Sequence, residues 1–137
     1  MAKVSGLGSA ITIDDASGTP RIISNDITNY SFTTPRGVQD VTGLDKSATE
    51  RILLLADFTN QLNGVVNYTA NQSHDVFKTV TSTSVNRTSV HQVTSAGSPS
   101  ITCEILYTDY QITRAATGEL TWQVPGSLAD GAVPTWA

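Results

Sequence analysis

The chain has 137 residues, which suits one domain with its own core, and we predict a single domain across residues 1–137. Charged residues make up 15% of the chain and its formal net charge is −4, so it lacks the excess of Lys and Arg that nucleic-acid binding requires. Ser, Thr and β-branched residues are abundant, and this composition favours strands over helices.

The N-terminal part of the chain predicts short paired strands. Residues 9–15 alternate between apolar and polar side chains, and a turn at residues 16–20 joins them to a short partner at residues 21–24. Residues 29–34 alternate again. We therefore expect an N-terminal hairpin followed by a third strand.

A long polar segment follows at residues 36–49, and we predict that it forms a long β-hairpin loop, because it far exceeds a tight turn. Residues 50–62 are predicted as a strand. A helix at residues 48–55 is the alternative, because Ser47 and Glu50 match a capping box that precedes an apolar run. The Asn, Thr and Gly residues further along are poor helix formers and favour the strand.

The second half of the chain predicts one helix and two strands. A short helix is expected at residues 72–81, with Asn71 or Ser73 as its N-cap. Residues 100–114 are apolar on both faces, which predicts a long strand covered on both sides, and residues 119–124 alternate cleanly. The whole pattern predicts a mainly β fold, a β-sandwich or partly closed barrel with one short flanking α-helix.

No residues form a recognisable catalytic or metal site, so we predict a protein that is not an enzyme and uses no cofactor. His74 and His91 lack Cys or carboxylate neighbours at metal-ligand spacing. The single cysteine, Cys103, excludes an intramolecular disulfide and is interpreted as a small core residue. Trp122 lies on the inward face of its strand, which favours core packing over a carbohydrate platform.

The location of the protein is predicted from what the chain lacks. The N-terminus has no long apolar region of the kind found in signal peptides, and no segment has the apolar length needed to cross a bilayer. A lone cysteine fits a reducing compartment. We expect a chain that is made in a cytoplasm and does not contact a membrane.

The order of the segments along the chain resembles one protein family. A hairpin, a long polar segment, an amphipathic helix and two closing strands follow one another. The segments that carry the likeness are IISNDITNY (22–30), FTTPR (32–36), DVTG (40–43), ATER (48–51), LADFT (55–59), NGV (63–65) and SHDVF (73–77). In this order they resemble the major tail tube proteins of long-tailed bacteriophages, and the likeness spans nearly the whole chain.

The resemblance implies a structural virion protein that assembles with itself, in rings that are usually hexameric and stack into a hollow tail tube. DNA would pass through the lumen without specific binding. The partners implied are other copies of the chain, a tape-measure protein and tail-end proteins, with assembly in the host bacterial cytoplasm. Contacts are expected from an N-terminal arm (1–8), a C-terminal arm (127–137) and the long loop, where the inter-subunit candidates are Arg36, Asp40, Asp45 and Lys46.

Lumen-facing or interface candidates are the polar side chains of strands whose other face is apolar. They are Asp57, Thr59, Glu119, Thr121 and Gln123. Acidic and neutral side chains there would leave DNA without a cationic surface to bind. Other functions stay open: a monomeric β-sandwich binding module for carbohydrate or a virion surface, a small hydrolase that uses Asp and Glu, or another tail component such as a terminator or connector.

Overall fold

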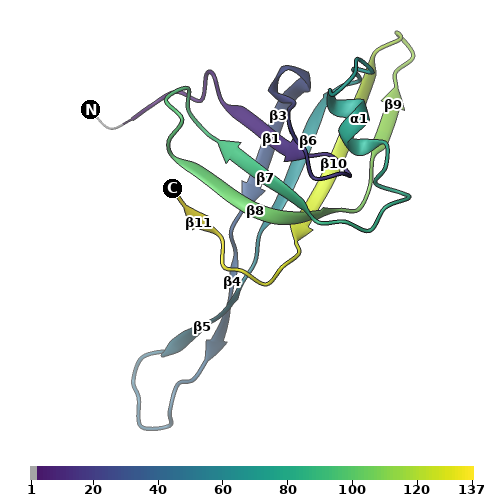
Figure 1. Ribbon diagram of the computed structural model, residues 1–137. Coiled ribbons are helices and arrows are strands. Elements are labelled where there is room, and N and C mark those ends of the chain that lie inside the picture. Colours follow the sequence, from purple (N-terminus) through teal and green to yellow (C-terminus); the bar gives the residue numbers. More distant parts are fainter. Residues whose placement is uncertain (1–2) are drawn as a thin grey trace.

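The computed structural model describes residues 3–137, and most of its regular structure consists of antiparallel strands (Figure 1). The elements in chain order are β1 (Ala10–Asp14), β2 (Pro20–Ile22), the 3-10 helix η1 (Ser24–Asp26), β3 (Ile27–Thr33), β4 (Arg36–Asp40), β5 (Arg51–Ala56), β6 (Thr59–Val65), α1 (Ser73–Phe77), β7 (Arg87–Gln92), β8 (Ser100–Tyr107), β9 (Gln111–Arg114), β10 (Leu120–Leu128) and β11 (Thr135–Trp136). This agrees with the predicted mainly β fold.

One large sheet folds over on itself into two layers. Its strand order is β2-β1-β7-β8-β10-β6-β3, with β11 paired to β8 and β9 paired to β10. We call β2, β1, β7, β8 and β11 the β1 layer, and β9, β10, β6 and β3 the β6 layer; the layers cross in Figure 1. They join where Gly126–Leu128 of β10 pairs with β8. The described strands leave β2 and β3 as free ends, so the sheet is a sandwich-like curl and not a closed barrel.

The core fills the space between the two layers, because alternate residues of each strand point inward. In β8 the inward series is Ile101, Cys103, Ile105 and Tyr107; in β6 and β10 it includes Leu62, Trp122 and Val124. The predicted core positions of Cys103 and Trp122 are therefore confirmed.

Helix α1 covers one end of this core and is held by two buried charged side chains. The Asp26 carboxylate accepts hydrogen bonds from the Ser73 backbone N–H at 3.0 Å and the Asn67 amide at 2.8 Å. At the C-terminal end of the helix, the Arg87 guanidinium donates to the Val76 carbonyl at 2.6 Å. A carboxylate at the N-terminus and a cation at the C-terminus both complement the helix dipole.

The helix is shorter than the predicted range of residues 72–81, and its cap is different. The N-cap residue is Gln72, which makes no side-chain capping bond, so neither Asn71 nor Ser73 has that role. Asp26, which is distant in sequence, supplies the missing acceptor. Several β-branched residues follow Phe77, and this composition weakens the continuation of a helix.

Two predicted strands are each broken in two. The strand predicted at residues 50–62 is wrong as one element, because Asp57 and Phe58 separate β5 from β6 and the Phe58 side chain is completely buried. The strand predicted at residues 100–114 likewise ends at Tyr107 and resumes as β9. Aromatic residues beside both breaks pack in or against the core: Phe58 at the first, Tyr107 and Tyr110 at the second.

The predicted hairpin loop at residues 36–49 is a hairpin with its own strands, because β4 pairs with β5 in a separate two-stranded sheet. The predicted C-terminal arm at residues 127–137 begins inside β10 and returns to the body as β11, where the Trp136 ring lies 5.8 Å from the Phe32 ring. Of the predicted N-terminal arm, residues 3–8 form no helix or strand, and residues 1–2 lie outside the described residues.

Candidate assembly surfaces

The outward surface of the β6 layer carries no charged side chain along its strands. We call this surface the polar face. Its rows follow the strand register, so hydroxyl and amide side chains stand side by side across the layer. Its members are Asn29, Ser31, Thr33, Thr59, Gln61, Asn63, Val65, Gln111, Thr113, Thr121, Gln123, Pro125 and Ser127.

Hydrogen bonds between neighbouring strands hold several of these side chains in place. The Thr33 and Thr59 hydroxyls lie 3.0 Å apart, and the Asn63 amide donates to the Asn29 side chain at 2.5 Å. Most members are exposed, so the face is accessible in a single copy of the chain. Such a surface can contact water or another polar surface, and it offers no charge to a phosphate group.

The structure brings together three of the five lumen candidates predicted from the sequence. Thr59, Thr121 and Gln123 all belong to the polar face, on adjacent strands β6 and β10. Asp57 and Glu119 lie outside the strands: Asp57 links β5 to β6, and Glu119 precedes β10 at the other end of the layer. The carboxylates therefore flank the polar face at its two ends.

The second surface is the hairpin arm, residues 36–56, which projects from the body as a continuation of β3 and β6 (Figure 1). One side of it presents Val38, Leu53 and Leu55, and the other presents Ile52 and Leu54. These side chains are exposed, Leu55 to 90%. A two-stranded hairpin with apolar side chains in water on both faces has little stability of its own, so a contact that covers both faces would stabilise this arm.

The arm's backbone is nevertheless ordered by its own polar residues. Arg36 donates two hydrogen bonds to the Leu54 carbonyl, at 3.0 and 2.9 Å. At the tip, Asp40 accepts from the Thr42 N–H at 2.9 Å, and the Thr42 hydroxyl oxygen accepts from the Glu50 N–H at 2.8 Å. Hydrogen bonds from the Thr42 hydroxyl and the Thr42 N–H lower the pKa of the Asp40 carboxyl.

The four predicted inter-subunit candidates all lie on the hairpin arm. Arg36 and Asp40 stabilise the arm internally, as just described. Lys46 forms an ion pair with Glu50 at 3.4 Å, and Asp45 is exposed at the tip. Sequence reasoning missed the apolar residues 52–55, because their continuous apolar run indicated a buried sheet strand. Their position after a long polar loop was the signal that they belong to a projecting hairpin.

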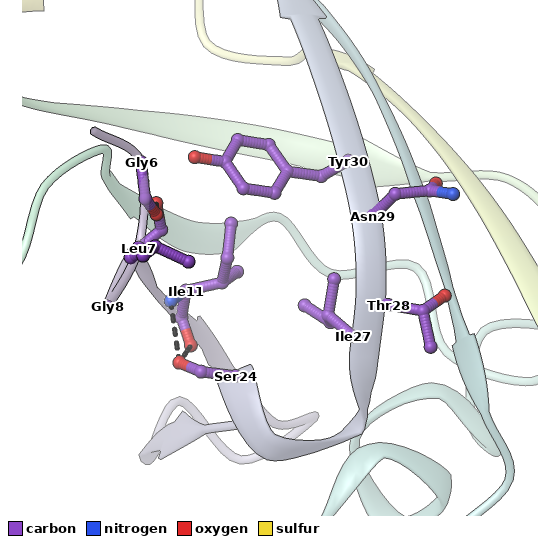
Figure 2. A pocket seen from close by; sticks show the side chains of 10 residues that line it. Gly6, Leu7, Gly8, Ile11, Ser24, Ile27, Thr28, Asn29 and Tyr30 are labelled. Carbon is purple, nitrogen blue, oxygen red and sulfur yellow. Dashed lines mark hydrogen bonds between the residues drawn. The ribbon is translucent and has the colours of Figure 1, made fainter.

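A third feature is a pocket between the N-terminal segment and β3, which we call the N-terminal pocket. Its volume is about 430 Å³, and it is lined by residues 6–9 and by Ile11, Ser24, Ile27, Thr28, Asn29 and Tyr30. Figure 2 shows Leu7, Ile11, Ile27 and Tyr30 around the opening, while Thr28 and Asn29 point away from it across β3. The pocket therefore lies beside β3, one of the two free ends of the sheet.

Two titratable side chains, those of His91 and Cys103, are buried in the body. His91 is buried, its Nε2 lies 3.1 Å from the Asn60 amide nitrogen, and burial lowers its pKa to about 4. Burial, with a smaller contribution from Asp130, raises the pKa of the Cys103 thiol to about 11.

Across residues 3–137, no three His, Cys, Asp or Glu side chains are grouped closely enough to hold a metal ion. No helix in that range has the length and apolar character needed to cross a membrane.

Comparisons with known proteins identify the fold. No family model and no curated protein matches the chain. The structure is similar to a chain from the tail of an empty gene transfer agent particle, solved by helical refinement with C6 symmetry: 15% identity, TM-score 0.78, covering 98% of this chain and 99% of that chain. It is also similar to a chain from the virion of a native gene transfer agent particle: 13% identity, TM-score 0.75, with coverage of 98% and 99%. The likeness to virion tail proteins expected from the sequence is thus confirmed at the level of the fold.

Proposed function

We propose that this chain is the subunit of a tail tube: copies assemble into stacked hexameric rings around a lumen through which DNA passes during ejection. The proposal rests on the polar face, a sheet surface without charge, on a fold that over its full length matches a chain from a tail with C6 symmetry. On this reading the protein belongs to a virion tail, and other copies of itself are its main partners.

The polar face suits the wall of a DNA channel because it gives a phosphate backbone nothing to bind. Lys and Arg hold DNA by releasing its counterions, and the face contains neither. Hydroxyl and amide groups keep such a wall hydrated, as passage of a hydrated polyanion requires. Asp57 and Glu119 would add rings of negative charge at the two ends of each neutral band.

The edges of the β6 layer suit the contacts within a ring. Within residues 3–137, β3 and β9 each have a strand partner on one side only. Free edges of this kind pair readily with another chain. Two different edges on one subunit make a heterologous contact, and such contacts close into a ring when the rotation between copies allows it.

The hairpin arm is assigned to contacts between copies, because assembly would remove its apolar side chains from water. Ile52, Leu53, Leu54 and Leu55 lie well outside the body of their own chain. Burial of such side chains contributes roughly 1.5–3 kcal/mol each when complete. Tape-measure and tail-end proteins are the further partners we propose for an assembled tube.

Negative-stain microscopy of the purified chain tests assembly. Rings or tubes with a central hole are the expected result, whereas a particle that stays monomeric at high concentration would favour a monomeric binding module.

Labelling of assembled tubes tests the assignment of the lumen. A bulky maleimide should modify Thr102→Cys, on the outward surface of the β1 layer, and should spare Gln123→Cys on the polar face. Both variants should react when the tubes are dissociated. Equal labelling of the two in intact tubes would remove the polar face from the lumen.

A further inference from the structure

The N-terminal pocket is preformed, because hydrogen bonds within the chain hold the N-terminal segment that forms one of its walls. The Ser9 hydroxyl donates to the Gly6 carbonyl at 2.6 Å and lies 2.9 Å from the Val93 carbonyl, which fixes the N-terminal segment against the body. Gly8 has a φ of +81°, and a Cβ there would lie 2.7 Å from the Ser95 Cβ, so only glycine fits this turn. A partner entering the pocket would find its shape already formed.

Apolar side chains line the pocket, and Leu7 is the most exposed of them. Leu7 is 82% exposed and turns toward the opening beside Ile11, Ile27 and Tyr30 (Figure 2). None of the lining residues is charged. A small apolar group would therefore suit this site.

The tip of the hairpin arm carries such a group. Leu44 is fully exposed, next to Gly43 and close to Val41, and these three residues are uncharged. The tip is ordered by the Asp40, Thr42 and Glu50 bonds described above. Binding would therefore cost little conformational entropy.

The tip and the pocket lie on opposite sides of the body (Figure 1). The pocket is lined by the first residues of β3, and the end of β3 leads directly into the hairpin arm, which extends away from the body (Figure 1). Contact between two different surfaces on opposite sides of one molecule is heterologous and propagates along a line. The same contact cannot form within one copy.

The charges beside the two surfaces are complementary. Asp45 follows Leu44 at the tip, and Lys3 lies on the N-terminal segment that borders the pocket. Within residues 3–137 neither side chain has an ion-pair partner. Opposite charges beside two docking surfaces support the orientation of a contact more than its affinity.

We propose that the N-terminal pocket receives the hairpin tip of a second copy of this chain, with Leu44 as the inserted side chain. The inference rests on the proposed function, since it assigns the contact that joins successive rings. The other possible occupant of the pocket is an edge strand from a neighbour in the same ring, and the proposal favours the hairpin tip.

Disulfide trapping in assembled tubes tests this contact. The double variant Leu44→Cys with Leu7→Cys should give a ladder of covalent oligomers under mild oxidation, and each single variant should give at most dimers. Leu44→Cys with Ile22→Cys is the matched control, because Ile22 is also exposed, to 69% against 82% for Leu7, but lies on β2 outside the pocket. A ladder no stronger than this control in intact tubes would overturn the proposal. So would a ladder from Leu7→Cys with Gln111→Cys, which places an edge strand in the pocket.

A second variant separates this inference from the proposed function. Leu44→Asp should leave rings intact and reduce the yield of tubes at least tenfold, while Leu44→Met should restore the tubes. Normal tubes from Leu44→Asp would refute the docking and leave the tube function standing. If the unaltered chain forms neither rings nor tubes, the proposed function fails, and the docking fails with it.

Discussion

Gly64 of β6 lies directly opposite Trp122 of β10, so closely that the indole occupies the space of a side chain. A Cβ at position 64 would lie 2.6 Å from the Trp122 ring and 2.0 Å from the backbone oxygen of Asp26. The Trp122 indole N–H donates to the Val65 carbonyl at 2.8 Å, which locks the ring over this strand. Two of the four strands that carry the polar face, β6 and β10, are thus fixed to each other by an aromatic–glycine contact on their inner side.

Gly64→Ala should therefore destabilise the fold by about 3 kcal/mol, because the added methyl group collides with backbone that cannot move without parting β3 from β6. Urea unfolding followed by Trp fluorescence measures the change. Gly6→Ala is the control: its nearest contact would be 3.7 Å away, and it should shift stability by less than about 0.5 kcal/mol. Equal effects of the two substitutions would contradict the close approach at Gly64.

Arg87→Met should destabilise the fold by about 3 kcal/mol, because it leaves buried acceptors without donors. The guanidinium donates to the Val76 and Asp14 carbonyls and, at 3.0 Å, to the Thr79 hydroxyl, which ties helix α1 to β1. Loss of helix α1 packing should appear as faster amide hydrogen exchange at residues 73–77. Arg21→Met, which breaks only the partly exposed ion pair with Asp15, is the control and should cost less than about 1 kcal/mol. Similar exchange rates in both variants would remove Arg87 from this role.

Stability should fall as the pH is lowered from 7.5 to 5, because burial lowers the pKa of His91 from 6.5 to about 4. In this interval the unfolded chain binds a proton that the folded chain excludes, so the stabilisation present above pH 6.5 is lost as the pH falls toward 4. The loss by pH 5 should be about 2 kcal/mol.

His91→Gln tests this assignment: it should be less stable at pH 7.5 but nearly independent of pH in the same interval. His74→Gln should keep the full dependence. Asp15 does not interfere, because its pKa lies at about 2, where hydrogen bonds from Ser17, Thr19 and Arg21 outweigh the opposing effect of burial. A pH dependence that survives in His91→Gln would assign the effect to another group.

The sequence predicts this structure best where polar and apolar residues alternate regularly along a strand. The alternation at residues 119–124 correctly placed Trp122 and Val124 in the core, because both neighbours of each residue are polar or small. Alternation predicts a face but not the end of a strand. Glu119 therefore looked like part of the series, although it precedes β10.

The hairpin arm shows the main limit of prediction from a single chain. Residues 52–55 form an apolar run, and such a run normally indicates burial. Here Phe58 enters the core while the leucines before it stay exposed, and only contact with another chain would bury them. A pattern within one chain cannot separate a core strand from a strand that is buried by assembly.

Leu53→Asp and Leu55→Asp should leave the body folded and abolish tubes. Both side chains lie on the hairpin arm, 58% and 90% exposed, so a charge there costs the isolated subunit less than about 0.5 kcal/mol. In an assembly it would be buried without a partner, at several kcal/mol per subunit. Thermal unfolding should be unchanged and microscopy should show no tubes. Ile22→Asp, an exposed apolar position on β2, is the control; tubes from all three variants would remove the hairpin arm from the contact.

A positive charge on the polar face should make the proposed tube bind DNA, which the unaltered tube should not do. Gln123→Lys adds one cation per subunit, so each proposed hexameric ring would gain a circle of ammonium groups able to displace counterions from a duplex. Assembled tubes of this variant should retain a short labelled duplex on sedimentation and release it as salt is raised, whereas tubes of the unaltered chain should retain almost none.

Thr102→Lys carries the same charge on the outward surface of the β1 layer, at an exposed strand position. DNA on that variant should be removed by a nuclease, and DNA retained by Gln123→Lys should be protected inside the tube. Equal nuclease sensitivity of both complexes would place position 123 outside the lumen.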